Sequence, residues 1–170
     1  MIGSKIKAKL LPGLIRKAKK ANARPLVSGS GRIGLIVDAK DLEKKSGLLK
    51  IHDLAGYPKK DCKLVICGSR KEIVDVNFPV ILDPSEISIG GKFESEDIRN
   101  FIATEFDFLI CNFSESCLHG MLLAASSKVS VKIGNSPDEF GVFDLEIEAE
   151  NPDVFQQETL KYIEIFKKNR

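Results

Sequence analysis

Residues 106–113 read FDFLICNF, and this stretch, together with RIGLIVD at 32–38 and KLVICG at 63–68, decides the fold. Each run is largely apolar at successive positions, without the alternation of a strand that has one face in water. Such runs are typical of strands buried on both faces of a parallel sheet. They predict the centre of a sheet that helices cover on both sides.

Helical signals alternate with the strand signals along the rest of the chain. Helices are expected over 41–55, from an N-cap at Ser95 to about Thr104, after a cap at Ser114 or Ser116, and from Asn151–Pro152 onwards. Further strands are expected at 129–134 and 144–148, with short extended pieces within 72–83. This alternation predicts an α/β fold, a three-layer sandwich with a mainly parallel sheet.

Charge is divided unevenly along the 170 residues. The first 37 residues carry nine positive charges and no acidic residue, and the first carboxylate is Asp38. The remainder has 17 basic and 24 acidic residues, a net charge of −7 that the overall +2 conceals. This division predicts a basic segment that meets a polyanion or an anionic surface, residues 1–31, attached to an acidic globular domain, residues 32–170.

Residues 5–22 have the periodicity of an amphipathic helix, which Pro12 either kinks or begins, and residues 23–32 form a linker. The apolar side consists of Ile6, Leu10, Leu11, Leu14, Ile15 and Ala18. The residues expected to bind an anionic partner are Lys5, Lys9, Arg16, Lys17, Lys19, Lys20 and Arg24. RNA or a ribonucleoprotein is favoured slightly over a membrane surface; on RNA the lysines would neutralise phosphates without reading the sequence. The alternatives are docking of this helix on its own domain, and pairing with a protein partner or a second copy through Ile6, Leu10 and Leu14.

The loops that follow the strands are the second candidate site. In a parallel sheet, ligands bind beyond the carboxyl ends of the strands, near the point where the strand order reverses. The residues expected there are Asp38, Lys40, Ser69, Arg70, Asn112, Ser114, Asn135 and Ser136. Their polarity would suit a small phosphorylated ligand, although many strand-to-helix loops share this composition.

Short motifs do not identify a cofactor. The sequence GSGRIG at 29–34 has the letters of a dinucleotide-binding loop, but its glycines precede the strand instead of following it. Gly90-Gly91-Lys92 is followed by Phe93, where a phosphate-binding loop needs a hydroxyl side chain. His52 and His119 have no zinc or triad spacing and are expected at a helix surface or boundary. No catalytic residue, cofactor or metal site is therefore predicted.

Cysteine usage and hydropathy bear on location. Cys62, Cys67, Cys111 and Cys117 form no CxxC pair, and two of them lie in apolar runs, so buried reduced thiols are expected. No apolar run is long enough to cross a bilayer. The expected location is the cytoplasm, with peripheral association with a membrane or a ribonucleoprotein.

Much of the chain resembles an uncharacterised family of short single-domain proteins of Bacteroidota, filed as a domain of unknown function. The resemblance is carried by SIGGK at 88–92, FDFLI at 106–110, AASSK at 124–128 and VKIG at 131–134. It implies a Rossmann-like fold and supplies no catalytic residue. Residues 106–134 are also similar to the acceptor-side domain of heptosyltransferase-type glycosyltransferases, which need a second domain that this chain has no room for.

The function that these patterns predict is a non-enzymatic cytoplasmic adaptor domain that binds an anionic partner through its basic N-terminal helix. The alternatives are a small ligand-binding module or enzyme that uses the strand-end loops, and a protein-interaction domain.

Overall fold

A computed structural model describes residues 2–22, 29–73, 80–135 and 137–169. In these residues six parallel strands form one sheet in the order β3-β2-β1-β4-β5-β6. The strands are β1 (Ile33–Asp38), β2 (Cys62–Cys67), β3 (Ile81–Leu82), β4 (Glu105–Asn112), β5 (Lys128–Asn135) and β6 (Leu145–Ile147). This is the order of Rossmann-type sheets, which reverses between β1 and β4. The predicted α/β class and parallel sheet are confirmed.

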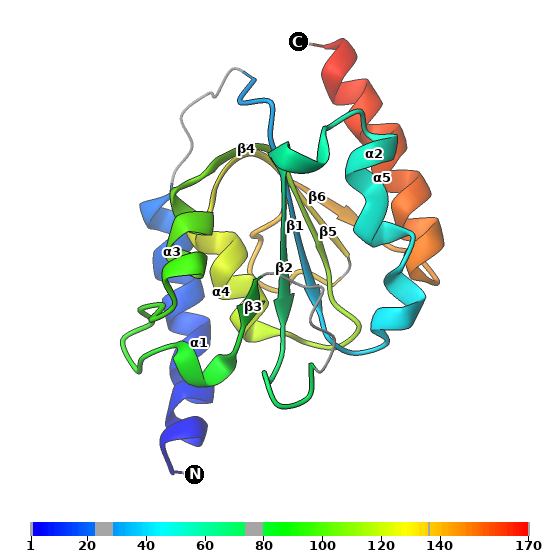
Figure 1. Cartoon of the computed structure of the whole chain (residues 1–170). Helices are drawn as coiled ribbons and strands as arrows, with labels where there is room; N and C mark the ends of the chain where they lie inside the picture. The colour runs from blue at the N-terminus through cyan, green and yellow to red at the C-terminus, as the bar shows by residue number, and fades with distance from the viewer. Residues whose placement is uncertain (1, 23–28, 74–79, 136, 170) are drawn as a thin grey trace.

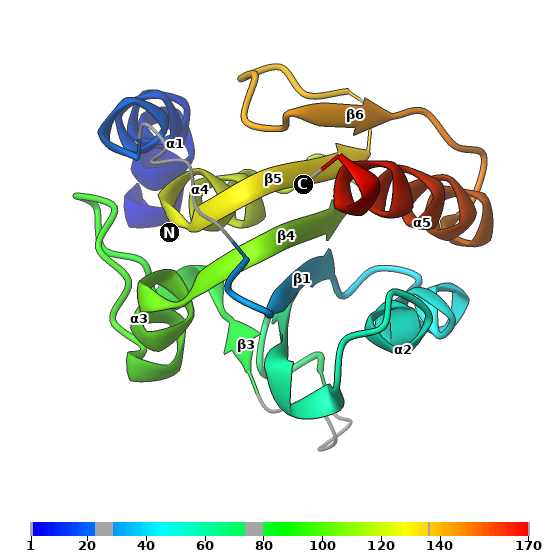
Figure 2. The same cartoon turned by 90° about the horizontal axis from the view of Figure 1, so that it is seen from above.

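Helices cover both faces of the sheet. One face carries α1 (Ile2–Ala21), α3 (Glu96–Ala103) and α4 (Leu118–Ser126), and the other carries α2 (Ile51–Leu54) and α5 (Pro152–Lys168), as Figures 1 and 2 show. All six residues of β1 and all but the first of β4 are buried. Ile36 and Leu109 join the core on the α4 side, while Leu35 and Ile110 join the core on the α5 side. The continuous apolar runs therefore mark strands that are buried on two faces, as expected.

The connection between β1 and β2 differs from the continuous helix expected over 41–55. Within the expected range it consists of two 3₁₀ turns, Leu42–Lys45 and Leu48–Lys50, followed by the single turn of α2, and a further 3₁₀ turn, Lys59–Asp61, precedes β2. Gly47 separates the two 3₁₀ turns, and glycine disfavours a helix interior. The Lys45 side chain turns inward to the end of β1, so this segment is shaped by a tertiary contact as well as by its own propensity.

Helix caps follow the sequence in two cases out of three. The Asn151 side chain accepts a hydrogen bond from the Val154 N–H at 2.9 Å, which confirms the predicted start of α5. Ser95 holds the N-cap position of α3 without a side-chain cap bond. The expected cap of α4 at Ser114 or Ser116 is wrong, because the N-cap is Cys117. The backbone N–H groups of Ser114 and Glu115 instead donate hydrogen bonds to the Asp38 carboxylate, and α4 begins only at Leu118.

The N-terminal helix packs on the rest of the chain. Leu11 and Ile15 are 2% and 0% exposed and belong to the core that includes α4. Helix α1 runs through Pro12 without a break, so proline neither begins it nor divides it in two. Its first turns extend past α4 (Figure 1), and Ile6 and Leu10 are 43% and 42% exposed. The expected apolar side is therefore only partly buried.

Two expectations fall outside the described residues. They are the part of the predicted linker at 23–28 and most of the short extended pieces within 72–83, of which β3 is described.

Candidate functional site

The outward side of α1 gathers exposed cations. Lys5, Lys9, Arg16 and Lys20 are three or four residues apart or multiples of that spacing, so they project from one side of the helix. We call these four residues the basic face. They lie roughly opposite the buried Leu11 and Ile15 on the helix, which fixes their direction toward solvent.

The cations of α1 have no carboxylate partner within the described residues. Ion pairs in this part of the chain involve Lys40, Lys44, Lys45, Arg70 and Lys161. Two α1 cations instead contact the loop after β5: the Lys19 Nζ donates to the Phe140 carbonyl at 3.3 Å, and the Arg16 guanidinium lies 5.4 Å from the Phe140 ring centroid. Lys17 is exposed beside the basic face, and Arg24 lies outside the described residues.

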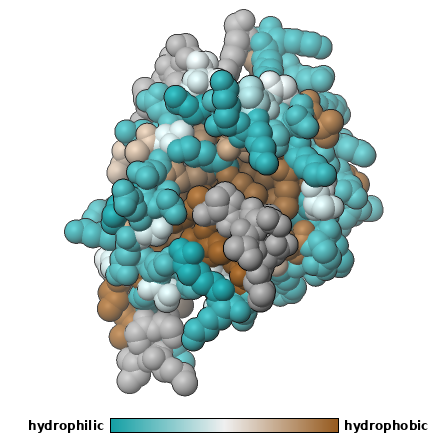
Figure 3. Space-filling view, viewed as in Figure 1, coloured by the Kyte–Doolittle hydropathy of each residue, from teal (hydrophilic) through white to brown (hydrophobic). Residues whose placement is uncertain are grey.

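Apolar side chains border the basic face near the start of α1. Ile6 and Leu10 are 43% and 42% exposed, and Ile89, which is 52% exposed, lies on another side of α1 beside Lys7, Leu11 and Leu14. Figure 3 shows apolar surface at the lower left, beside the first turns of α1. Leu14 is partly buried and packs against Gly91, where an added Cβ would lie 3.0 Å from Leu14 Cδ1. Of the trio expected to contact a protein partner, only Ile6 and Leu10 remain exposed.

The second candidate site is formed by the loops at the carboxyl ends of the strands. A buried ion pair lies there between β1 and β4, where the strand order reverses. Asp38 ends β1 and is 7% exposed, while Lys45 is 0% exposed and binds its carboxylate. The Lys45 Nζ also donates to the Asp38 carbonyl at 3.2 Å. The backbone N–H of Ser114 donates to both Asp38 carboxylate oxygens at 3.0 Å, and that of Glu115 donates to Oδ2 at 3.3 Å. Asp38 thus has its hydrogen-bonding capacity met by the protein itself.

The other predicted loop residues are also engaged with the chain. Lys40 pairs with Glu115, which raises the Lys40 pKa, chiefly through their hydrogen bond. Arg70 binds Glu86 through two bonds of 2.9 and 3.0 Å, and its backbone N–H donates to Asp83 at 2.9 Å. The Ser69 Oγ accepts from the Lys71 N–H at 3.3 Å. Ser69 and Arg70 therefore belong to a structural cluster at the end of β2 and β3.

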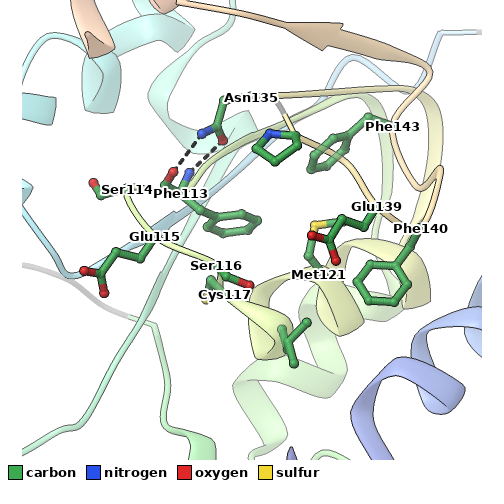
Figure 4. A pocket seen from close by; sticks show the side chains of 12 residues that line it. Phe113, Ser114, Glu115, Ser116, Cys117, Met121, Asn135, Glu139, Phe140 and Phe143 are labelled. Atoms are coloured by element: carbon green, nitrogen blue, oxygen red, sulfur yellow. Dashed lines mark hydrogen bonds between the residues drawn. The ribbon is translucent and has the colours of Figure 1, made fainter. Parts of the chain in front are cut away.

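Three predicted residues, Asn112, Ser114 and Asn135, come together around hollows at the ends of β4 and β5. Asn135 accepts from the Phe113 N–H at 2.8 Å and donates to the Phe113 carbonyl at 2.7 Å, as the dashed lines in Figure 4 show. A cavity of about 300 Å³ lies beside this pair, with apolar Phe113, Met121 and Phe143 among its walls. A second hollow of about 350 Å³ is bordered by Asn112, Ser114 and Asn135. Ser136 lies outside the described residues.

The sequence did not single out Cys117, which lines the first cavity and caps α4. Its side chain forms a hydrogen bond with that of Cys67, at the end of β2, and this bond is the main factor that lowers the Cys117 pKa. The Cys67 pKa is raised well above its ordinary value by the same bond and by burial. All four cysteines are free thiols, as expected, but two of them are half-buried, Cys62 and Cys117. A search for CxxC finds only cysteines three positions apart, so it could not find Cys67 and Cys117, which are 50 positions apart.

Both histidines, His52 and His119, lie in helices, at positions that leave them partly exposed. Among the described residues, no group of three His, Cys, Asp or Glu side chains is placed to hold a metal ion. Within the same residues, no helix has the length and apolar character that a membrane span requires.

Comparison with known proteins identifies a family whose function is unknown. No curated protein and no solved structure matches the chain. The bacterial phylum and the similarity to glycosyltransferases therefore stay predictions. The family described as "Family of unknown function (DUF6913)" matches residues 4–166, which include most of α1, the whole sheet and most of α5. The predicted membership of an uncharacterised family is thus confirmed, and the chain belongs to the DUF6913 family of unknown function.

Proposed function

We propose that this protein is a non-enzymatic adaptor domain that binds RNA, alone or within a ribonucleoprotein, through the basic face of α1. The observation that carries the proposal is the arrangement of Lys5, Lys9, Arg16 and Lys20, which are exposed on a helix whose other side is anchored in the core. Cations that stabilise a fold usually have carboxylate partners, and these four have none within the described residues. The cytoplasm, where the sequence predicts this protein, would supply such a polyanion.

Docking of α1 favours binding because it fixes the helix before the partner arrives. A segment that folds only on binding loses affinity to the entropy of ordering. Here Leu11 and Ile15 already hold the helix against α4, so only the lysine and arginine side chains need to be ordered. Four phosphates could be neutralised along one side of α1 without rearrangement of the sheet.

The chemistry predicts binding without sequence preference. Ammonium and guanidinium groups contact phosphate oxygens, which every nucleotide carries. The basic face contains no aromatic side chain on which a base could stack. Affinity should therefore depend on salt and little on base composition.

A membrane surface is the second candidate, and one observation favours it. Ile6 and Leu10 are exposed on the flank of the basic face, where they could enter the interface of an anionic bilayer while the lysines contact headgroups. Two apolar side chains give a weak anchor, so this mode would depend strongly on anionic lipid.

The proposal is tested with two variants of equal net charge. The basic-face variant carries Lys5→Gln, Lys9→Gln, Arg16→Gln and Lys20→Gln, and the control carries Lys50→Gln, Lys59→Gln, Lys60→Gln and Lys71→Gln, which are also exposed. Binding of a labelled single-stranded RNA of mixed sequence is followed by fluorescence anisotropy at several salt concentrations. Sedimentation with vesicles of phosphatidylcholine, with and without phosphatidylserine, is measured in parallel.

We expect the basic-face variant to bind RNA about tenfold or more weakly than wild type, and the slope of log K against log salt to fall by about 3, since each lost phosphate contact removes about 0.7. The control should bind like wild type. Equal losses in both variants would show that net charge alone attracts RNA and would overturn the proposal. Vesicle binding that needs phosphatidylserine, without RNA binding, would favour the membrane instead.

A further inference from the structure

Two cysteines that are 50 positions apart meet at the carboxyl end of the sheet. Cys67 is the last residue of β2, and Cys117 is the N-cap of α4. Their side chains are joined by a hydrogen bond. Nothing in the proposed RNA-binding role of α1 uses this pair.

The surroundings shift the pKa of the two thiols in opposite directions. Cys117 accepts the hydrogen bond from Cys67 and another from the Gly120 N–H in the first turn of α4, and both lower its pKa. Burial and the Asp38 carboxylate oppose this effect, while the ammonium of Lys45 supports it. Anions are stabilised at helix N-termini, where N–H groups point outward. The same hydrogen bond between the two side chains thus lowers the pKa of the more exposed thiol, Cys117, and raises that of the buried Cys67.

Access also distinguishes the two sulfur atoms. Cys117 is half-buried and lines the cavity of about 300 Å³ beside Phe113 and Met121. Figure 4 shows Cys117 on the loop that leads into α4, with the Phe113 ring and Met121 around the same space. Cys67 is 4% exposed and is not among the residues that line this cavity. A small reagent would meet Cys117 first.

We propose that Cys117 and Cys67 form a thiol oxidation site that reduces a small hydroperoxide, with Cys117 as the attacking sulfur and Cys67 as the resolving sulfur. The Cys117 thiolate attacks the terminal, hydroxyl-bearing oxygen of ROOH, the O–O bond breaks, and the departing alkoxide takes a proton from solvent and leaves as ROH. Cys117 is then a sulfenic acid. The Cys67 sulfur releases its proton and attacks the Cys117 sulfur, and the departing hydroxide takes that proton to form water. The hydroperoxide is reduced to an alcohol, and the two thiols are oxidised to one disulfide.

Cys62 supplies a matched control within the same chain. Like Cys117 it is a half-buried free thiol, but it begins β2 at the opposite end from Cys67. Burial raises the Cys62 pKa to about 11, so it is protonated at neutral pH. Cys62 and Cys117 are thus both half-buried, whereas the pKa is raised at Cys62 and lowered at Cys117.

The first experiment treats the reduced full-length protein with hydrogen peroxide at neutral pH and maps its disulfides by mass spectrometry of peptides. We expect a Cys67–Cys117 disulfide in wild type and in Cys62→Ser. The variant Cys117→Ser should form no intramolecular disulfide. The variant Cys67→Ala should accumulate a sulfenic acid at Cys117 that dimedone traps. Should Cys67→Ala not fold, the wild-type disulfide map tests the proposal by itself.

The second experiment compares alkylation of the folded protein by iodoacetamide at Cys117 and Cys62. Thiolate is the reactive form, so Cys117 should react at least about tenfold faster at neutral pH. Equal rates at the two cysteines, or a peroxide-treated wild type without the Cys67–Cys117 bond, would overturn the proposal.

Discussion

Cations in two regions of this protein differ in their surroundings. At the strand ends, Lys40, Lys45 and Arg70 each contact a carboxylate: Glu115, Asp38 and Glu86. On α1, the basic face has no such contact within the described residues. Positive charge is paired within the fold in the first region and faces solvent in the second. The two regions differ in the partners of their charges and not in the sign of those charges.

Loss of the buried ammonium of Lys45 should have the largest effect on stability. Lys45→Met leaves the Asp38 carboxylate buried without its counter-ion, a change that typically costs about 3–5 kcal/mol of unfolding free energy. Urea unfolding of the variant measures this. The control is Lys44→Met, whose exposed side chain lies 3.8 Å from Asp41 and should change stability by less than about 1 kcal/mol. Similar losses of unfolding free energy in Lys45→Met and Lys44→Met would show that burial of the Lys45–Asp38 pair adds nothing to the stability of the fold.

Truncation within α1 should have the next largest effect. Ile15→Ala removes a fully buried side chain from the contact with the core, and we expect a loss of about 3 kcal/mol in urea unfolding. Leu10→Ala is the control, because Leu10 is 42% exposed and its truncation should cost well under about 1 kcal/mol. A small loss for Ile15→Ala would mean that α1 is not anchored, and the basic face would then lack a fixed direction.

The smallest expected effect is a pH dependence that links α1 to α4. Burial lowers the pKa of His119, with a further contribution from the positive charge of Lys7, while Asp83 opposes both. The unfolded chain therefore binds a proton before the folded protein does. Stability should fall as the pH drops below 6.5, the ordinary value, until the folded pKa is passed.

Lys7→Gln should raise the His119 pKa and reduce this loss, which NMR titration and urea midpoints at several pH values would measure. Lys5→Gln, on the exposed basic face, is the control and should leave the His119 titration unchanged. A His119 pKa that does not respond to Lys7→Gln would place α1 farther from α4 than the structure does.

The sequence predicted the sheet and the amphipathic helix because these depend on neighbouring residues. Runs such as FDFLICNF can be satisfied only by burial on two faces, and the Asn151 cap is recognisable from a few adjacent positions. The acid-free start of the chain located the cations of α1 in the same way. In contrast, the helix expected over 41–55 is divided into two 3₁₀ turns and the single turn of α2, and the inward turn of Lys45 to Asp38 is a distant contact that neighbouring residues do not predict.

By itself, then, the sequence determined the α/β class, the order of most elements and the uneven charge. Only the tertiary structure decided which cations are paired, which apolar residues of α1 are buried, and that Cys117 meets Cys67. The physical reason is distance along the chain. Hydrophobic periodicity and capping depend on residues a few positions apart, so they can be recognised in a single sequence. An ion pair or a thiol pair forms only when the sheet brings distant segments within a few ångströms, and no local pattern in the sequence predicts that contact.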